Sequence, residues 1–409
     1  MVVSPPDILR AEIHLPSSKS ISNRALVIRA LSSGNMPVDN VSDCDDSRVV
    51  EEALRHMPRV IDIKAAGTAM RFMTSLLAVV GGEHIVTGTE RMHNRPIAVL
   101  VDALRSLGAD ITYMEKDGFP PLRIKGGELT GGRLVLPGNV SSQYISSLLM
   151  IAPRLKEGLV LQLTGEVISR PYIDMTLAIM QQFGAKAQWI DERTVSVEPV
   201  PYSPIPYYIE ADWSAASYWY EMVALTADEG AKVLLPGLFR ESLQGDSKVA
   251  ELFFGLGVGT RFCANAVQLV KTPYDTGVFE CDLTGQPDLA QTIVVTCCML
   301  GRHFRISGLQ TLRIKETDRI AALQRELGKL GFVIGVEGDD TMFWSGEMAT
   351  GSGEVSDVAI DTYEDHRMAM AFAPVALIRG SITINNPDVV SKSYPRFWED
   401  MKKAGFKLV

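Results

Sequence analysis

The segment LRIKETDRIAAL places Lys315 and Arg319 beside Glu316 and Asp318, in a chain whose formal net charge is −9. Apolar residues recur at helical spacing from residue 314 to residue 331, so we expect Lys315 and Arg319, four residues apart, to share one face of a helix. Two positive charges on one face repel each other unless an anion lies between them. That anion is either an acid of the same segment or a substrate phosphate or carboxylate, which Arg and Lys both bind.

Two further groups of polar residues precede apolar helical segments. DTYEDHRMAMAF puts Asp365, His366 and Arg367 in succession before one such segment, and GQPDLAQTIVV puts Asp288 before another. An acid in this place is either a helix N-cap or a general base that faces a bound hydroxyl. The sequence by itself leaves both interpretations open.

Motifs for common cofactor and nucleophile chemistry are absent from the sequence. The chain has no GxxxxGK[ST], no GxGxxG after a strand, no GxSxG and no HExxH, and its five cysteines form no CxxC pair. We therefore expect reduced thiols, no metal site, no nucleotide site and no covalent nucleophile.

Charge, hydropathy and length limit the class of protein. An isoelectric point near 5.3 argues against general nucleic-acid binding, so any bound anion must be met by local basic clusters. The N-terminus has no signal-peptide pattern, and no segment offers the roughly 18 unbroken apolar residues of a membrane span. We expect a cytoplasmic protein without a membrane span, and 409 residues predict two domains.

Glycines mark an internal repeat. Five amphipathic segments each end in a glycine that leads into an extended apolar segment: Gly108, Gly184, Gly257, Gly331 and Gly405. Successive glycines are 76, 73, 74 and 74 residues apart. A glycine after a helix is the usual left-handed C-cap, so each unit is predicted to be helix, glycine, strand. Met57 takes the place of the glycine in an earlier copy, 51 residues before Gly108, which indicates a shortened first unit.

A second series of segments alternates with the first. Six segments begin with small or capping residues and continue as mostly apolar helices: SSKSISNRALVIRALSSG, AAGTAMRFMTSLLAVVGG, NVSSQYISSLLMIAPRL, ADWSAASYWYEMVALTADEG, QPDLAQTIVVTCCMLG and YEDHRMAMAFAPVALIRG. Helices of this type are buried on nearly all sides. About six units, each with one buried helix, one amphipathic helix and several strands, predict a duplicated α/β architecture of two domains with three units each.

Basic side chains lie in the first turns of these segments. They are Lys19, Arg24, Arg71, Lys315, Arg319 and Arg367. Helix N-termini present free N–H groups and a partial positive charge, so several of them together would bind anions. The recurrence across the series favours an anion site over ordinary surface charges.

Nine motifs occur in order and together resemble the 5-enolpyruvylshikimate-3-phosphate (EPSP) synthase family of enolpyruvyl transferases. They are PSSKSISNRAL, AAGTAMRFM, ERMHNRPI, SSQYISSLLM, SRPYIDMTL, ADWSAASY, PDLAQT, RIKETDR and DTYEDHRMAM. The resemblance implies an inverted α/β barrel-like fold of two domains, each of three βαβαββ-type units with the first unit shortened. It implies a discontinuous domain of residues 1–17 and 212–409, an inserted domain of residues 18–211, and an active site in the cleft between them.

The resemblance also implies a reaction. Members of the family transfer the enolpyruvyl group of phosphoenolpyruvate to the 5-hydroxyl of shikimate 3-phosphate and release phosphate through a tetrahedral adduct. They use no metal or organic cofactor. The partners implied are these two small molecules, with no nucleic acid and no membrane, and a monomer is expected.

The family's functional residues carry over motif by motif. The residues implied to bind shikimate 3-phosphate are Lys19, Ser20, Arg24, Ser141, Ser142, Gln143, Ser169, Tyr172, Asp288, Thr311 and Lys315. Those implied to bind phosphoenolpyruvate are Lys19, Gly67, Arg95, Gln143, Lys315, Arg319, Arg367 and Lys392. The implied catalytic residues are Asp288, which would accept the 5-hydroxyl proton, Glu316 and Lys19, which would serve proton transfers at the methylene, and Lys315. The residues expected behind them are Asp365, His366 and Arg71.

The sequence departs from the family pattern at three positions. Ala65 stands where an asparagine is usual, Phe72 where a proline is usual, and Thr311 where an asparagine often occurs. Glyphosate, an inhibitor of the family, contacts the glycine-containing turn beside the first two, so we expect an altered inhibitor response.

Two other interpretations stay open. One is enolpyruvyl transfer to UDP-N-acetylglucosamine, whose enzymes usually carry a reactive cysteine in a mobile loop. This chain has no cysteine between Cys44 and Cys263. The other is a homologue that binds ligands without catalysis.

Overall fold

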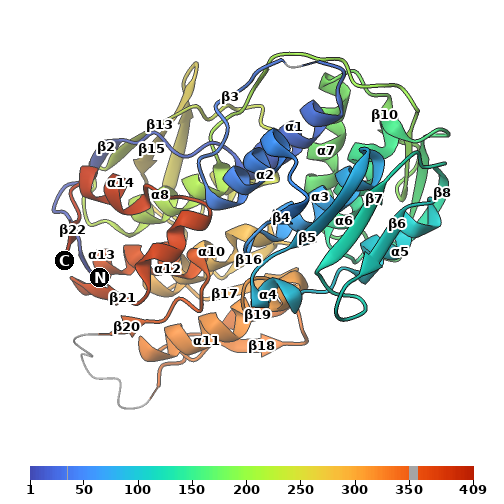
Figure 1. Ribbon diagram of the computed structural model, residues 1–409. Helices are drawn as coiled ribbons and strands as arrows, with labels where there is room; N and C mark the ends of the chain where they lie inside the picture. The colour runs from blue at the N-terminus through green and yellow to red at the C-terminus, as the bar shows by residue number, and fades with distance from the viewer. Residues whose placement is uncertain (35, 350–357) are drawn as a thin grey trace. The chain divides into compact units, whose positions relative to one another are not determined.

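The computed structural model describes residues 1–34, 36–349 and 358–409. The chain divides into two compact units, which are called here the terminal unit (residues 1–16 and 210–409) and the inserted unit (residues 17–209). Figure 1 shows the elements of both units coloured along the chain. The repeated units expected from the glycine spacing, with the βαβαββ order that the resemblance implies, are confirmed within each of them.

The terminal unit contains three such repeats. The first has β2 (Arg10–Glu12), α8 (Trp213–Leu225), β13 (Lys232–Pro236), α9 (Val249–Leu252), β14 (Val258–Phe262) and β15 (Ala266–Lys271). The second has β16 (Phe279–Asp282), α10 (Ala290–Met299), β17 (Phe304–Ser307), α11 (Arg319–Lys329), β18 (Gly335–Glu337) and β19 (Thr341–Trp344). The third has β20 (Ala359–Ile360), α12 (His366–Phe372), α13 (Ala376–Arg379), β21 (Ile382–Ile384), α14 (Phe397–Lys403), β22 (Lys407–Leu408) and β1 (Val2–Ser4).

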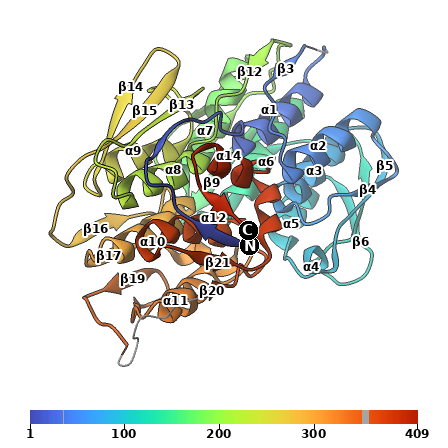
Figure 2. The same ribbon diagram turned by 90° about the vertical axis from the view of Figure 1, so that its left-hand side faces the viewer.

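Each repeat forms one four-stranded sheet with the same pairing. In the second repeat β16 lies parallel to β17, β17 is antiparallel to β19, and β19 is antiparallel to β18. The third repeat is completed by both ends of the chain, because β1 pairs with β21 and with β22. The N- and C-termini therefore lie side by side, as Figure 2 shows.

The inserted unit has two full repeats and one short one. The short repeat has α1 (Lys19–Leu31), β3 (Val38–Asp39), α2 (Asp45–His56) and β12 (Tyr207–Tyr208). The next has β4 (Val60–Asp62), α3 (Gly67–Val79), β5 (Gly82–Thr87), α4 (Glu90–His93), α5 (Ala98–Ser106), β6 (Asp110–Tyr113) and β7 (Leu122–Gly126). The last has β8 (Gly132–Pro137), α6 (Ser142–Ile151), β9 (Leu159–Thr164), α7 (Arg170–Gln182), β10 (Ala187–Trp189) and β11 (Thr194–Val197). The short repeat has a two-stranded sheet where the others have four strands, as expected.

Short 3-10 helices connect several of these elements. They are η1 (Ala152–Arg154), η2 (Gly245–Lys248), η3 (Pro287–Leu289), η4 (Gln310–Ile314), η5 (Ala373–Val375) and η6 (Pro387–Lys392). Of these, η2 carries Asp246, η3 carries Asp288, and η4 leads into the loop that carries Lys315. They let the chain turn before the next helix begins.

The glycines that mark the repeat end helices as predicted. All five have a backbone φ between 85° and 103°, the left-handed region that a side chain disfavours. Met57, which replaces the glycine in the short repeat, adopts the same conformation with φ at 40°. The repeat signal therefore reflects a shared way of turning from helix to strand.

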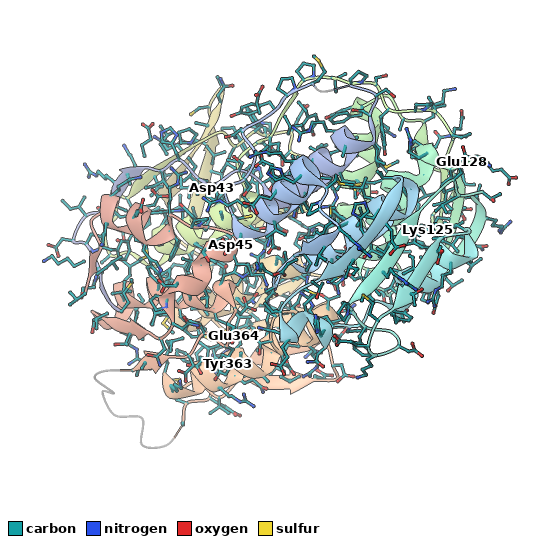
Figure 3. All side chains as sticks on the ribbon, viewed as in Figure 1. Asp43, Asp45, Lys125, Glu128, Tyr363 and Glu364 are labelled. Carbon is teal, nitrogen blue, oxygen red and sulfur yellow. The ribbon has the colours of Figure 1, made fainter. Side chains whose placement is uncertain are left out.

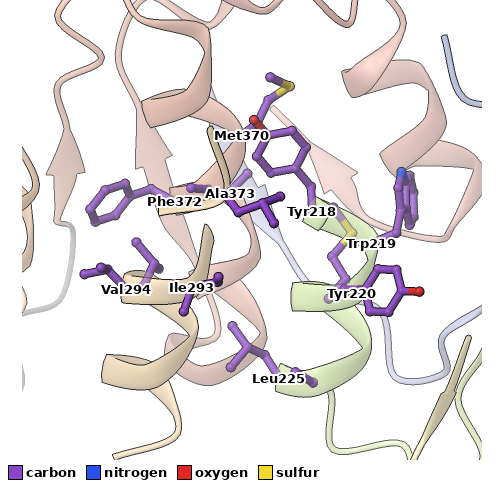
Figure 4. Packing of buried hydrophobic residues seen from close by; sticks show 14 of the residues in the cluster. Tyr218, Trp219, Tyr220, Leu225, Ile293, Val294, Met370, Phe372 and Ala373 are labelled. Carbon is purple, nitrogen blue, oxygen red and sulfur yellow. The ribbon is translucent and has the colours of Figure 1, made fainter. Parts of the chain in front are cut away.

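Three apolar helices form the centre of the terminal unit. Every residue of α10 and α12 is buried, and α8 packs against both. Figure 4 shows Tyr218 on α8, Ile293 on α10 and Met370 on α12 within this core. Helices that are apolar on all sides must be covered by other elements along their length. Polar side chains that could bind a ligand are therefore expected at their N-terminal ends.

Candidate active site

Asp288 of the terminal unit is surrounded by three basic side chains. Its Oδ1 lies 3.1 Å from Arg319 Nη1 and 3.7 Å from Lys315 Nζ, and its Oδ2 lies 2.9 Å from Arg367 Nη2. Arg367 also donates to the backbone carbonyl of Asp288. The carboxylate thus joins the second repeat to the third, and it is no helix cap, because α10 begins after Leu289.

These cations control the protonation of Asp288. Burial alone would raise the pKa of this carboxyl, but Arg367, Lys315 and Arg319 outweigh burial and hold the pKa well below its usual range. An ionised carboxylate can accept a proton, but one held by three cations is a weak base. It becomes a stronger base when another anion takes over those cations.

Arg319 connects three carboxylates. Its Nε lies 2.7 Å from Asp365 Oδ2 and its Nη2 lies 2.9 Å from Glu316 Oε2, in addition to its contact with Asp288. Burial would lower the pKa of this guanidinium, but the acids Asp365, Glu316 and Asp288 raise it. Lys392 Nζ lies 2.8 Å from the other oxygen of Glu316. The cluster holds four cationic side chains and three carboxylates.

The prediction that Lys315 and Arg319 share one face of a helix is wrong. Residues 310–314 form a 3-10 helix, and α11 begins only at Arg319. The side chain of Asp318 accepts a hydrogen bond from the Ala321 amide and fixes that start as an N-cap. Lys315 lies in the loop before the helix, and it shares Asp288 with Arg319 through the fold of the loop.

Arg313, to which the sequence assigned no role, supports this loop. Its guanidinium lies 3.2 Å from Asp318 Oδ2 and donates to the backbone carbonyl of Asp339. Arg313 therefore binds the residue that caps α11, and it is not among the cations that contact Asp288. The Thr311 hydroxyl on the same loop has no hydrogen-bond partner among the described residues.

The DHR segment forms the start of α12. Asp365 is the N-cap and accepts a hydrogen bond from the Arg367 amide at 2.9 Å. His366 is buried, with Nδ1 3.7 Å from Asp365 Oδ1. Asp365 thus contacts both Arg319 and the backbone of Arg367, and it lies behind the two side chains that contact Asp288.

Two residues of this site gave no signal in the sequence. The Tyr218 hydroxyl on α8 accepts a hydrogen bond from Arg367 Nη1 at 3.3 Å. Asp246 is buried and accepts a hydrogen bond from the Ser214 hydroxyl, and burial followed by the nearby Asp288 raises its pKa to about 7. Tyr218 lies within an apolar helix and Asp246 in a short polar turn, so neither pattern distinguishes them from structural residues.

Gly67 and Arg95 of the inserted unit lie against each other. Gly67 is the first residue of α3, and a Cβ built on it would come 2.3 Å from Arg95 Nη1 and 2.7 Å from Arg71 Nη1. Arg71 donates to the Gly67 carbonyl and lies over the ring of Tyr144. Only a residue without a side chain lets the Arg95 guanidinium approach this helix N-terminus so closely.

The start of α6 lies beside the start of α3. Gln143 Nε2 donates to Thr68 Oγ1 at 3.0 Å, and Ser141 is the N-cap of α6, followed by Ser142. Tyr144 fixes the loop that carries Arg95 by donating to the Pro96 carbonyl at 2.6 Å. The expected residues of two motifs 75 residues apart are therefore brought together.

The starts of α1 and α7 carry the remaining expected residues. Lys19 and Ser20 open α1, and Lys19 Nζ lies 3.7 Å from Asp46 Oδ2, an acid that the sequence analysis missed. Ser169 precedes α7 with φ at 54°, and its carbonyl accepts a hydrogen bond from the Tyr172 amide.

Arg24 lies deeper than the other expected residues. Its guanidinium is buried and donates to Thr176, Ser146 and the Ser20 and Tyr172 carbonyls. It therefore connects α1, α6 and α7, and burial lowers its pKa to about 10. A substrate contact by Arg24 stays a prediction.

The described residues offer no group of three or more His, Cys, Asp or Glu side chains that could hold a metal ion. No helix within the described parts of the chain is long and apolar enough to cross a membrane. Two groups of residues are therefore suited to anion binding by Lys, Arg and helix N-termini: the cluster around Asp288 in the terminal unit, and the helix starts with Lys19, Gly67, Arg95 and Gln143 in the inserted unit. Carboxylates in the cluster around Asp288 can also move protons.

Comparisons with known proteins agree with this chemistry. A family model described as EPSP synthase (3-phosphoshikimate 1-carboxyvinyltransferase) matches residues 3–61 and 58–401. The chain is 53% identical over 407 residues to a 3-phosphoshikimate 1-carboxyvinyltransferase of Bacteroides fragilis, covering 100% of this chain and 98% of the relative. It is 36% identical to one from Photobacterium damsela subsp. piscicida, covering 98% and 99%.

A solved structure shows the same fold. EPSP synthase from Acinetobacter baumannii superposes with a TM-score of 0.79 at 21% identity, covering 99% of this chain and 98% of that one. The expected two-domain α/β fold of repeated units is thus confirmed. From the matches over its whole length, the chain belongs to the EPSP synthase family of transferases.

Proposed function

We propose that this protein transfers the enolpyruvyl group of phosphoenolpyruvate to the 5-hydroxyl of shikimate 3-phosphate and releases inorganic phosphate. The observation that carries the proposal is the Asp288 carboxylate held by Lys315, Arg319 and Arg367. Each substrate bears a phosphate and a carboxylate, which match these cations. Family membership supplies the identity of the two substrates.

Anion exchange at this cluster would prepare the base. A phosphoenolpyruvate phosphate or carboxylate that binds Arg319, Arg367 and Lys392 takes over cations that now contact Asp288 and Glu316. The pKa of Asp288 then rises from its depressed value, because its stabilising charges are shared with the substrate. Asp288 becomes able to accept the proton of the 5-hydroxyl when that substrate is in place.

The proposed reaction has two steps that balance. The 5-hydroxyl oxygen adds to C2 of phosphoenolpyruvate, its proton passes to Asp288, and C3 gains a proton to become a methyl group. The bond between C2 and the phosphate oxygen of the tetrahedral adduct then breaks and releases phosphate. A proton leaves the methyl group and restores the C2–C3 double bond. Glu316, with Lys19, serves the proton transfers at C3, and Lys315 stabilises the negative charge beside Asp288.

We assign the cluster of the inserted unit to the same substrates. Gly67, Arg95 and Gln143 would hold phosphoenolpyruvate, and the residues that would hold shikimate 3-phosphate are Lys19, Ser20, Arg24, Ser141, Ser142, Gln143, Ser169 and Tyr172. Thr311 would join them from the terminal unit. The support is the close approach of Arg95 to a helix N-terminus, a geometry suited to a phosphate or carboxylate. Closure of the two domains around both substrates would exclude water.

We further propose that the enzyme works as a monomer on these small molecules in the cytoplasm. The acidic isoelectric point disfavours nucleic-acid binding, and free cysteines are typical of a reducing compartment such as the cytoplasm. Light scattering during gel filtration tests the monomer, and a dimer mass would reject it.

Phosphate release by the purified protein tests the function. We expect release only with both substrates present, together with an enolpyruvyl ether product seen by NMR. Asp288→Asn keeps the size of the side chain and removes the base, so its rate should fall at least about 100-fold. Asp7→Asn, at an exposed position, is the matched control and should keep the wild-type rate.

Two results would overturn the proposal. Phosphate release that requires UDP-N-acetylglucosamine in place of shikimate 3-phosphate would identify the sister reaction. Binding of shikimate 3-phosphate without any phosphate release would identify a homologue without catalysis.

A further inference from the structure

The loop before α12 contains two adjacent residues in a disfavoured backbone conformation. Tyr363 has φ at 53° and Glu364 has φ at 56°. Among the described residues these are the only neighbours along the chain, apart from glycines, that both have positive φ. An aromatic residue rarely adopts this conformation, so the surroundings must hold it there. Figure 3 labels both residues on this loop.

Glu326 of α11 accepts two hydrogen bonds from this loop. Its side chain is fully buried, its Oε1 accepts a hydrogen bond from the Tyr363 hydroxyl at 2.6 Å, and its Oε2 accepts one from the Asp361 amide at 3.0 Å. Lys329, one turn later, lies 2.7 Å from Glu326 Oε2 and donates to Asp361 Oδ2 and to the Ala359 carbonyl. The end of β20 at Ala359 and the loop at Asp361 and Tyr363 are thereby tied to one helix.

The same helix holds the far end of the loop. Arg319, seven residues before Glu326, shares the buried face of α11 and binds Asp365 through both Nε and Nη2. Asp365 in turn accepts the Arg367 amide. The left-handed pair therefore lies between two anchors on α11, Glu326 and Arg319.

We propose that Glu326 and Tyr363 form a latch that holds this left-handed turn and so directs Arg367 at Asp288, which makes both of them positioning residues for the anion site. The inference rests on the proposed function only for the identity of that anion. Within the described residues, the side chains of Glu326 and Tyr363 bind Asp361, Lys329 and each other, and none of these hydrogen bonds and ion pairs reaches Asp288 or its cations. Their effect passes through the backbone of residues 361–365.

Tyr363→Phe tests the latch with a minimal change. It removes one hydroxyl and keeps the ring that packs on the core. Tyr220→Phe is the matched control, because it removes another tyrosine hydroxyl hydrogen bond of the terminal unit, the one with Thr260 Oγ1. Any effect of Tyr363→Phe that Tyr220→Phe lacks belongs to the loop.

Hydrogen exchange measures the latch without any substrate. In Tyr363→Phe we expect the amides of residues 362–368 to exchange about 10-fold faster, the equivalent of one lost charge-assisted hydrogen bond, while Tyr220→Phe leaves them unchanged. Unchanged exchange in Tyr363→Phe would reject the latch. This measurement decides the latch even if the wild-type protein shows no phosphate release, a result that would count against the proposed function instead.

Kinetics measure the positioning role. We expect Tyr363→Phe to raise KM for phosphoenolpyruvate about 10-fold, with less than a twofold change in KM for shikimate 3-phosphate. Faster exchange with an unchanged KM for phosphoenolpyruvate would show that the turn is structural only, and would reject the positioning role.

A second substitution tests the conformational argument. Asparagine tolerates the left-handed region better than glutamate does, so Glu364→Asn should lessen the need for the latch. We expect Tyr363→Phe to raise KM for phosphoenolpyruvate by less than half as much in the Glu364→Asn background as it does in the wild-type protein. Simple additivity of the two substitutions would contradict a strained turn held by Tyr363.

Discussion

Arg319 and Asp365 form a two-point ion pair in the interior of the terminal unit, with Nε–Oδ2 at 2.7 Å and Nη2–Oδ1 at 3.3 Å. Both side chains are buried, with exposed fractions of 1% and 0%. The pair joins the start of α11 to the start of α12. A buried pair of this kind is costly to break, because the remaining partner keeps its charge without compensation.

We expect Arg319→Lys to lower both stability and activity. Lysine cannot supply the planar fork that reaches Asp365 and Asp288 together, so the unfolding free energy should fall by about 3 kcal/mol. Urea unfolding measures the change. The control is Arg305→Lys, whose partner Glu337 lies 2.6 Å away at the surface, and which should change stability by no more than about 0.5 kcal/mol. Equal effects of the two substitutions would contradict a special role for the buried pair.

Gly67→Ala should displace Arg95. The added Cβ would lie 2.3 Å from Arg95 Nη1, so the guanidinium must move away from the start of α3. We expect kcat/KM for phosphoenolpyruvate to fall roughly 10-fold to 100-fold. Gly81→Ala, where a Cβ meets nothing within 4 Å, should leave the kinetics unchanged. Wild-type kinetics in Gly67→Ala would show that Arg95 does not act from this place.

Asp246 should make stability depend on pH. Burial and the neighbouring Asp288 raise its pKa to about 7, whereas an unfolded aspartate has a pKa near about 4. Between these values the folded chain keeps a proton that the unfolded chain has lost, so this contribution to stability is full below about pH 4 and falls as the pH rises to about 7.

Asp246→Asn removes that dependence. From about pH 4 to about pH 7 its unfolding free energy relative to wild type should rise by up to about 4 kcal/mol, and the difference should then stay constant. Asp282→Asn is the contrasting control, because burial would raise the pKa of Asp282 but hydrogen bonds from Thr284 lower it. Its relative stability should therefore not rise with pH. Parallel behaviour of the two variants would contradict the assignment of Asp246.

Glyphosate inhibition should respond to residue 65. Ala65 is exposed immediately before the α3 turn, whereas Phe72 is buried beneath the guanidinium of Arg24 at 5.4 Å. We expect Ala65→Asn to change the inhibition constant for glyphosate by about 10-fold, the equivalent of one polar contact, with a smaller change in KM for phosphoenolpyruvate. Ala264→Asn, at an exposed turn of the terminal unit, is the control. An inhibition constant that is already of the ordinary sensitive type in the wild-type protein would contradict an altered response.

Several features of the fold could be predicted because they depend on local chemistry. The positive φ of Gly108 and of the four later glycines was predictable because a helix that turns sharply into a strand needs a residue that tolerates this conformation. Met57 could be aligned with them from the repeat alone. The burial of α10 and α12 followed from segments without a polar face.

The start of α11 was not predicted correctly, although its signal was present. Periodic apolar residues define the face of a helix but not its first residue, and the expected helix included Lys315. Asp318 ends the preceding loop by capping Ala321, which is a competition between a side chain and the helical backbone. A capping residue within a charged segment is easily taken for one more charge.

The sequence by itself determined the repeat, the buried and amphipathic helices, and the kinds of side chain at the helix starts, because each depends on neighbours within a few turns. Only the tertiary structure decided which charges meet. Asp288 and Arg367 are 79 residues apart, and they lie 2.9 Å from each other because the apolar helices α10 and α12 of two repeats pack against each other within one core. The left-handed turn at Tyr363 was equally invisible in the sequence, since it is held by Glu326 from another helix. Contacts between distant segments are fixed by the packing of the whole unit, and no local pattern records them.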